Sequence, residues 1–258
     1  LWAGWGAEGD IRSQRWRRGF ELDPNCVALR TALARQLAEH GQIDTAAVLI
    51  ADYTVQDAQA AAALGLTFWA NGSDAHWPLA QRLLQQAVAA DRQNALAAAA
   101  LAALLARQSA TAGAAPDASA HERLDEALLL ATQATQLASD DYRTWAALAD
   151  VHRAGGDYRQ AGFYYGFALR LEPAAPTVLK DAGANWLLAG EPRQALPLIE
   201  QALAVAPEDA ENFGNLTLVR DALGEGAAAL EAARQARQLQ PDDPRFAHLL
   251  AAMEEKME

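Results

Sequence analysis

The clearest pattern of apolar and polar positions runs from Tyr142 to Ala175. The first half of this segment has apolar and aromatic residues at helical spacing, namely Trp145, Leu148, Ala149 and His152. The second half repeats that spacing with Ala161, Tyr165, Ala168 and Leu171. The segment therefore predicts two successive amphipathic helices, each with one buried face.

Local signals mark the ends of both predicted helices. Gly155 and Gly156 end the first, because glycine takes the left-handed cap conformation at little cost, and Asp157 is a residue type that caps a following helix. Pro173 ends the second, because proline cannot continue a helix. The segment is thus predicted to form a helix–turn–helix hairpin.

The same hairpin recurs at an interval of 34 residues. The positions that keep this period are a turn glycine, two alanines of the second helix and a closing proline: Gly156, Gly190 and Gly224; Ala161, Ala195 and Ala229; Ala168, Ala202 and Ala236; Pro173, Pro207 and Pro241. A fixed period of about 20–50 residues is typical of arrays in which each repeat packs only on its neighbours. The chain is therefore predicted to be all-α and built from stacked hairpins.

These residues resemble the tetratricopeptide repeat (TPR) family. The segment 142–175 matches the family pattern at Trp145, Leu148, Ala149, Gly156, Ala161, Tyr165, Ala168 and Pro173. The next two units match it at Gly183, Trp186, Gly190, Ala195, Ala202 and Pro207, and at Phe213, Leu216, Gly224, Ala229, Ala236 and Pro241. The resemblance implies a right-handed superhelical α-solenoid of stacked hairpins.

The resemblance weakens upstream but predicts a single array over residues 1–258. Its units are a partial leading repeat at 10–26, repeats at 27–57, 58–94, 95–141, 142–175, 176–209 and 210–243, and a capping helix at 244–258. The unit 58–94 fits with Ser73 to Ala75 inserted at its turn. The unit 95–141 fits with a loop inserted at 109–121.

Two departures from the repeat have structural interpretations. The small, polar and Gly/Pro-containing residues of 109–121 predict a surface loop. A tolerated insertion is favoured over an interaction role for it, because lengthening a loop costs little entropy. Pro197 lies inside the second helix of the unit 176–209, where it is predicted to kink the helix without breaking it.

Composition narrows the classes of partner. The net charge of −12 and pI near 4.8 repel phosphate backbones, so no nucleic-acid partner is expected, although a simple solubility role also explains the charge. A single cysteine, Cys26, excludes disulfides and thiolate clusters within the chain. No run approaches the roughly 18 apolar residues of a membrane span.

The N-terminal segment leaves the compartment open. The sequence begins at Leu1, and a signal peptide or anchor upstream is one of the alternatives. A basic, aromatic cluster consists of Arg12, Arg15, Trp16, Arg17 and Arg18, with Trp2 and Trp5 before it. This cluster fits proximity to a membrane surface, but an arginine-rich outer face of the first helix is favoured.

A search for catalytic chemistry finds no constellation. The histidines (His40, His76, His121, His152 and His248) fall in different units without metal-ligand spacing. His152 occupies an aromatic position of its helix and is predicted to pack between helices. No serine lies in a nucleophile-elbow motif and Cys26 has no activating partner nearby in sequence. We predict no catalytic residue, no cofactor and no metal.

The resemblance implies that ligands bind on the first helix of each hairpin. The candidate groove residues are Trp69, Arg143, Asp150, Arg153, Thr177, Lys180, Leu187, Glu211, Leu218 and Asp221, with Ala146, Ala154, Ala184, Leu188, Gly214 and Ala222 at the remaining positions. The groove lacks the Lys/Asn array with which some family members hold a C-terminal carboxylate. Basic residues beside leucines favour a peptide with apolar anchors and some acidic character.

The sequence thus predicts a non-catalytic protein–protein interaction scaffold that binds a peptide or partner protein in the concave groove. The alternative is a regulatory or partner-recruiting domain of a larger membrane-associated or enzymatic bacterial protein. The bacterial source is suggested by the alanine-rich composition, which is associated with GC-rich bacterial genomes. The identity of the partner and the oligomeric state stay open.

Overall fold

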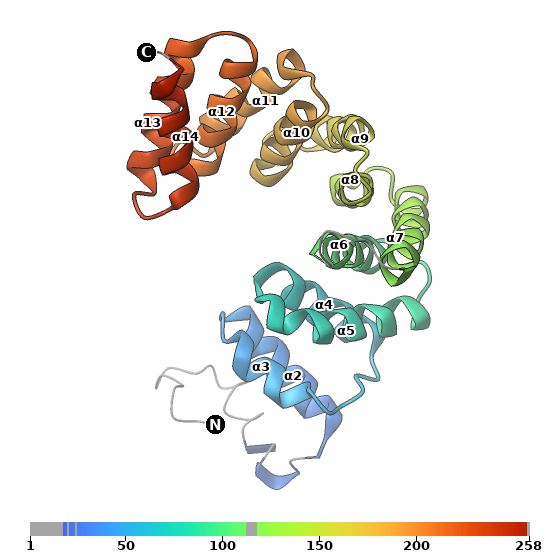
Figure 1. The fold of residues 1–258 in the computed structure, drawn as a ribbon. Coiled ribbons are helices and arrows are strands. Elements are labelled where there is room, and N and C mark those ends of the chain that lie inside the picture. Colours follow the sequence, from blue (N-terminus) through green and yellow to red (C-terminus); the bar gives the residue numbers. More distant parts are fainter. Residues whose placement is uncertain (1–17, 20, 24, 112–117, 257–258) are drawn as a thin grey trace. The chain divides into compact units, whose positions relative to one another are not determined.

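The computed structural model describes residues 18–19, 21–23, 25–111 and 118–256 (Figure 1). Within these residues all regular secondary structure is helical, and no helix is both long and apolar enough to cross a membrane. The predicted partial repeat at 10–26 and the basic cluster at 12–18 lie largely outside the described residues. Of that cluster only Arg18 is described, and it is exposed.

The chain divides into two compact units, 1–105 and 106–258, each of which is considered by itself. The described residues of the first unit include the helices α2 (Val27–Glu39), α3 (Ile43–Ile50), α4 (Ala58–Asn71), the short 3₁₀ helix η1 (Asp74–His76), α5 (Trp77–Ala90) and most of α6 (Ala95–Thr111). The unit boundary falls within α6. Helix α2 packs on α3, and α4 packs on α5.

The second unit contains three consecutive hairpins between α7 and a last helix. Its helices are α7 (Ala118–Leu137), α8 (Tyr142–Ala154), α9 (Tyr158–Leu171), α10 (Pro176–Leu188), α11 (Pro192–Val205), α12 (Ala210–Ala222), α13 (Gly226–Leu239) and α14 (Pro244–Glu255). Each hairpin packs on the next through α9 and α10, and through α11 and α12. The predicted all-α class of stacked helix–turn–helix hairpins is confirmed.

The turn glycines take the backbone conformation that their period predicts. Gly156, Gly190 and Gly224 have φ between 75° and 81°, in the left-handed region that glycine occupies without strain. In the first of these turns the N–H of Gly156 donates to the carbonyl of Arg153 (3.0 Å), and that of Asp157 donates to His152 (2.9 Å). This is the Schellman pairing, which satisfies the last carbonyls of the helix.

The periodic alanines are buried between packed helices. Ala161, Ala195 and Ala229 are fully buried. Glycine allows an even closer approach in α10, since a Cβ atom built on Gly183 would lie 2.5 Å from Cγ1 of Ile199 on α11. The 34-residue period therefore records where side chains must be small for helices to pack.

Several local expectations need correction or gain detail. The predicted loop 109–121 is too long, because α6 continues to Thr111 and α7 starts at Ala118; alanine in both flanks favours helix. The remaining residues, 112–117, lie outside the described residues. The insertion after Gly72 forms η1, and Gly72 itself has a negative φ. Helix α11 runs unbroken through Pro197.

Helix α3 ends without a closing proline, and two arginines donate hydrogen bonds to the carbonyls at its end. Arg82 of α5 donates to the carbonyls of Ala51 (2.6 Å) and Ile50 (2.9 Å). Arg30 of α2 donates to the carbonyl of Leu49 (3.0 Å). These bonds satisfy groups that a helix end would otherwise leave without partners.

Two glycine-to-alanine substitutions are expected to have opposite effects. Gly156→Ala places a Cβ in the left-handed region and should destabilise the second unit by about 1 kcal/mol. Gly166→Ala, in the exposed middle of α9 where an added Cβ meets no atom within 4 Å, should stabilise it by roughly 0.5–1 kcal/mol. Thermal unfolding followed by far-UV circular dichroism measures both; equal shifts would contradict the assignment of the turn.

Candidate functional site

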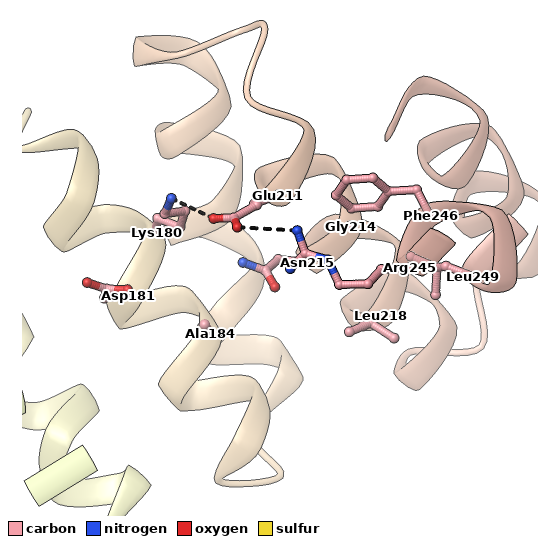
Figure 2. A pocket seen from close by; sticks show the side chains of 10 residues that line it. All are labelled: Lys180, Asp181, Ala184, Glu211, Gly214, Asn215, Leu218, Arg245, Phe246 and Leu249. Atoms are coloured by element: carbon pink, nitrogen blue, oxygen red, sulfur yellow. Dashed lines mark hydrogen bonds and ion pairs between the residues drawn. The ribbon is translucent and has the colours of Figure 1, made fainter. Parts of the chain in front are cut away.

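An open cleft of ≈ 410 Å³ lies along α10, α12 and α14 in the second unit (Figure 2). Helices α10 and α12 are the first helices of successive hairpins, and α14 follows the last hairpin. The cleft is lined by Lys180, Asp181, Ala184, Glu211, Gly214, Asn215, Leu218, Arg245, Phe246 and Leu249. It thus combines charged groups, one amide and an apolar wall.

Small residues on α10 and α12 leave room for the cleft, and α14 supplies its apolar wall. A Cβ atom on Gly214 would lie 3.0 Å from Cε1 of Phe246, so the two helices pack closely at this point. Phe246 is buried against Ala210 and Ala236. The helix predicted only as a cap at 244–258 therefore also forms one side of the cleft.

The cations that line the cleft are paired with the chain's own carboxylates. Nζ of Lys180 lies 2.8 Å from Oε2 of Glu211. Nη2 of Arg245 lies 2.7 Å from Oδ2 of Asp243 and 3.8 Å from Oε1 of Glu211. Burial lowers the pKa of Lys180, but its hydrogen bond to Glu211 and the nearby Asp209 outweigh this and raise it. Both cations are therefore largely neutralised.

A second polar cluster lies beside the cleft, between α8 and α9. The buried hydroxyl of Tyr165 donates to Oδ1 of Asp150 (2.6 Å), and Nη2 of Arg153 donates to the same oxygen (2.8 Å). Burial, followed by the charge of Asp150, raises the pKa of Tyr165 well above its usual range. The cluster fixes the position of the Asp150 carboxylate.

Asp181 differs from the other carboxylates of this region. Within the part of the chain that the structure describes, its carboxylate accepts no hydrogen bond and forms no ion pair, and Figure 2 draws no interaction to it. Burial and then the charge of Asp150 raise the pKa of Asp181 to about 6, although Arg153 and Lys180 act in the opposite direction. Asp181 is thus a half-buried carboxylate, and no hydrogen bond or ion pair among the described residues offsets the cost of burying its charge.

Asn215 is the second polar side chain of the cleft without a partner. Among the described residues its amide makes no hydrogen bond, and it lies on α12 between Glu211 and Leu218. An asparagine amide carries both donors and an acceptor. It can therefore bind a group that offers the complementary pair.

The structure brings together only part of the predicted groove set. Lys180, Glu211 and Leu218 line the cleft, and Asp150 and Arg153 form the neighbouring cluster. The cleft also contains Ala184 and Gly214, which occupy other groove positions of the repeat.

The other predicted residues lie elsewhere. Leu187 packs against the core of Ala195, Ile199 and Val219, and Asp221 pairs with Lys256 (2.6 Å). Thr177 is exposed in the first turn of α10. Arg143 holds Asp141 at the start of α8, with Nη2 2.6 Å from Oδ2. Trp69 belongs to α4 of the first unit, where its ring centre lies 6.0 Å from that of Trp77.

The sequence-based prediction missed Asp181, Asn215, Arg245, Phe246 and Leu249 as site residues. Asp181 and Asn215 lie one position after the predicted Lys180 and Gly214, so a small shift along each helix would have included them. The α14 residues were missed because that helix was treated only as a cap, although it starts 34 residues after α12. Its apolar spacing, with Phe246, Leu249 and Met253, was the available signal.

The histidine prediction is confirmed at the one position where it was specific. The ring of His152 lies 5.0 Å from that of Tyr164, between α8 and α9. Burial lowers the pKa of His152, partly offset by Asp157. Among the described residues no group of three or more metal-ligating side chains comes together.

Comparison with known proteins identifies the fold. No family model and no curated protein matches the chain. Among solved structures, a tetratricopeptide repeat protein from Parabacteroides merdae matches with a TM-score of 0.64 and 11% identity, over 93% of this chain and 90% of its own. The structure of Pseudomonas aeruginosa PilF matches with a TM-score of 0.64 and 18% identity, over 93% of this chain and 99% of its own. The fold is that of the tetratricopeptide repeat proteins.

A third match is to a larger assembly. The crystal structure of the APC/C hetero-tetramer of Cut9 and Hcn1 matches with a TM-score of 0.64 and 18% identity, over 94% of this chain and 46% of that one. The family resemblance of the sequence is thereby confirmed at the level of the TPR fold.

Replacing Asp181 by asparagine is expected to stabilise the protein at neutral pH. Because the folded-state pKa of about 6 exceeds the ordinary 3.8, the folded state binds more protons than the unfolded state between these values, so stability falls as pH rises through this window. Asp181→Asn removes this pH-dependent loss of stability. It should raise the free energy of unfolding by about 2 kcal/mol at pH near 7 and by little below pH of about 4.

Thermal or urea unfolding at several pH values measures this difference. Glu208→Gln, which removes an exposed carboxylate on the same unit, serves as the control and should change stability by at most a few tenths of a kcal/mol. A stabilisation by Asp181→Asn that is the same at both ends of the pH range would contradict the assignment.

Proposed function

We propose that the chain is a non-catalytic interaction scaffold that binds a peptide segment of a protein partner in the cleft along α10, α12 and α14. The observation that carries this proposal is the unpaired amide of Asn215 inside an open cleft with an apolar wall. A peptide group presents one donor and one acceptor, which the Asn215 amide complements. Leu249 and Leu218, beside the buried Phe246, offer the apolar surface for a side chain of the same peptide.

The arrangement of charges supports a binding role rather than a catalytic one. Glu211 interacts with both Lys180 and Arg245, so these groups hold neighbouring helices in place. None of the three is left as an isolated acid or base facing the cleft. Asp181 is the unpaired carboxylate of the lining, and no second unpaired acid or base lines the described cleft with it, so the arrangement suits holding a ligand better than acid–base catalysis.

The comparison with larger assemblies adds a second line of support. Cut9, whose structure this chain matches, was solved within a hetero-tetramer with Hcn1. We carry over from it only the expectation that this fold meets protein partners.

The paired cations change the expected character of the partner. Arg143, Arg153 and Lys180 suggested an acidic peptide, yet each is bound to a carboxylate of the chain: Asp141, Asp150 and Glu211. The structure gives the expectation of an acidic partner no support. Apolar contacts and peptide-group hydrogen bonds remain as the basis of binding.

A display library of random peptides, selected against the full chain, tests the proposal. Dissociation constants of the selected peptides should rise about five- to tenfold for Asn215→Ala, the cost of one hydrogen bond, and similarly for Leu218→Ala. Gln201→Ala, an exposed substitution on α11, is the control and should leave them unchanged. Failure to select any peptide, or unchanged binding by both cleft variants, would sink the proposal.

A further inference from the structure

The charges around the cleft leave one carboxylate uncompensated. The cations Lys180 and Arg245 each have carboxylate partners within the chain, as does Arg153 beside the cleft. Glu211 lies between Lys180 and Arg245. Asp181 is the described lining carboxylate without such a partner, and it faces the charge of Asp150.

Two carboxylates that interact in a half-buried position repel each other. Oδ1 of Asp150 is already occupied by Tyr165 and Arg153, so Asp150 cannot turn away without losing both bonds. Asp181 carries a negative charge that is partly removed from water. An arriving cation would pair with Asp181 and also reduce its repulsion with Asp150.

The cation that fits is a side chain rather than a bound metal ion. Within the described residues no group of three metal-ligating side chains assembles around Asp181. A lysine or arginine side chain needs only one carboxylate to form a charge-assisted hydrogen bond. The chain's net charge of −12 also favours the approach of a basic segment.

The apolar wall lies at the other side of the same cleft. Asp181 is on α10, whereas Phe246 and Leu249 are on α14, with α12 between them. Two helix spacings amount to roughly 16–20 Å. An extended peptide covers that distance with about four to six residues.

We propose, on the basis of the proposed function, that the cleft selects peptide segments that place a lysine or arginine against Asp181 and an apolar side chain against Leu249, beside the buried Phe246. The two side chains lie about four to six residues apart in the peptide. Asn215, between these two ends of the cleft, binds the peptide backbone. The recognised partner is therefore basic and apolar.

The test uses peptides from the random display library and the full chain. Sequences selected by the unmodified chain should be enriched in a basic residue at the stated distance from an apolar one. Asp181→Asn should weaken their binding roughly tenfold or more, because a hydrogen bond to a charged group is lost. Glu208→Gln, an exposed carboxylate outside the cleft, should change binding less than twofold at moderate salt.

A double-mutant cycle separates direct contact from general charge effects. Replacing the basic residue of a selected peptide by glutamine should weaken binding to the unmodified chain, and should have little further effect on Asp181→Asn. Asp181→Asn removes an unfavourable buried charge, so the variant is expected to fold. Equal effects of the peptide change on both proteins would overturn the inference.

The outcomes distinguish this inference from the function on which it rests. If selected peptides lack basic residues and Asp181→Asn binds them normally, while Asn215→Ala weakens them, the scaffold function stands and the basic specificity is wrong. If no peptide is selected, or if Asn215→Ala and Leu218→Ala also leave binding unchanged, the scaffold function itself fails.

Discussion

Close approach of neighbouring helices is the constraint on which the rest of this structure depends. Fully buried alanines such as Ala161 and Ala195 let the two helices of a hairpin meet with little side chain between them. Gly183 extends this to a contact that no Cβ would permit, since Ile199 occupies the space. Because these contacts are made at the same place in each hairpin, successive hairpins stack in the same way and present their first helices on one side.

The cleft results from that stacking and from the small side chains that line it on α10 and α12. Ala184 and Gly214 have little or no side chain, so α10 and α12 leave space beside Phe246 of α14. Charged residues then organise the rim, where Glu211 lies between Lys180 and Arg245. Asp181 and Asn215 stand apart from this network. Polar groups without partners usually reduce stability, and they concentrate where a protein binds something else.

The 34-residue period and the residue types at its positions predicted the fold well, because both are determined by packing within one hairpin. The turn at Gly156 and the buried Ala161 could be predicted from sequence, since each depends on its own hairpin. The cleft could be predicted only in part. Whether Lys180 is free or paired depends on Glu211 of the next hairpin. The apolar wall at Phe246 likewise depends on α14, which follows the hairpin of α12 and α13. Such properties arise between repeats, where a pattern within one repeat carries no information.

The arginines at the end of α3 have a consequence for the way in which the first unit folds. The last carbonyls of α3 are satisfied from α2 of its own hairpin by Arg30 and from α5 of the following hairpin by Arg82. The end of α3 is therefore completed only once the next hairpin is in place. The stability of a repeat array is approximately the sum of the stability of each hairpin alone and the interaction energy between neighbouring hairpins. Here part of the first contribution depends on the second, because the next hairpin supplies hydrogen bonds to the end of α3. Folding there should be more cooperative than in hairpins whose second helix is followed by a closing proline, such as Pro173 after α9.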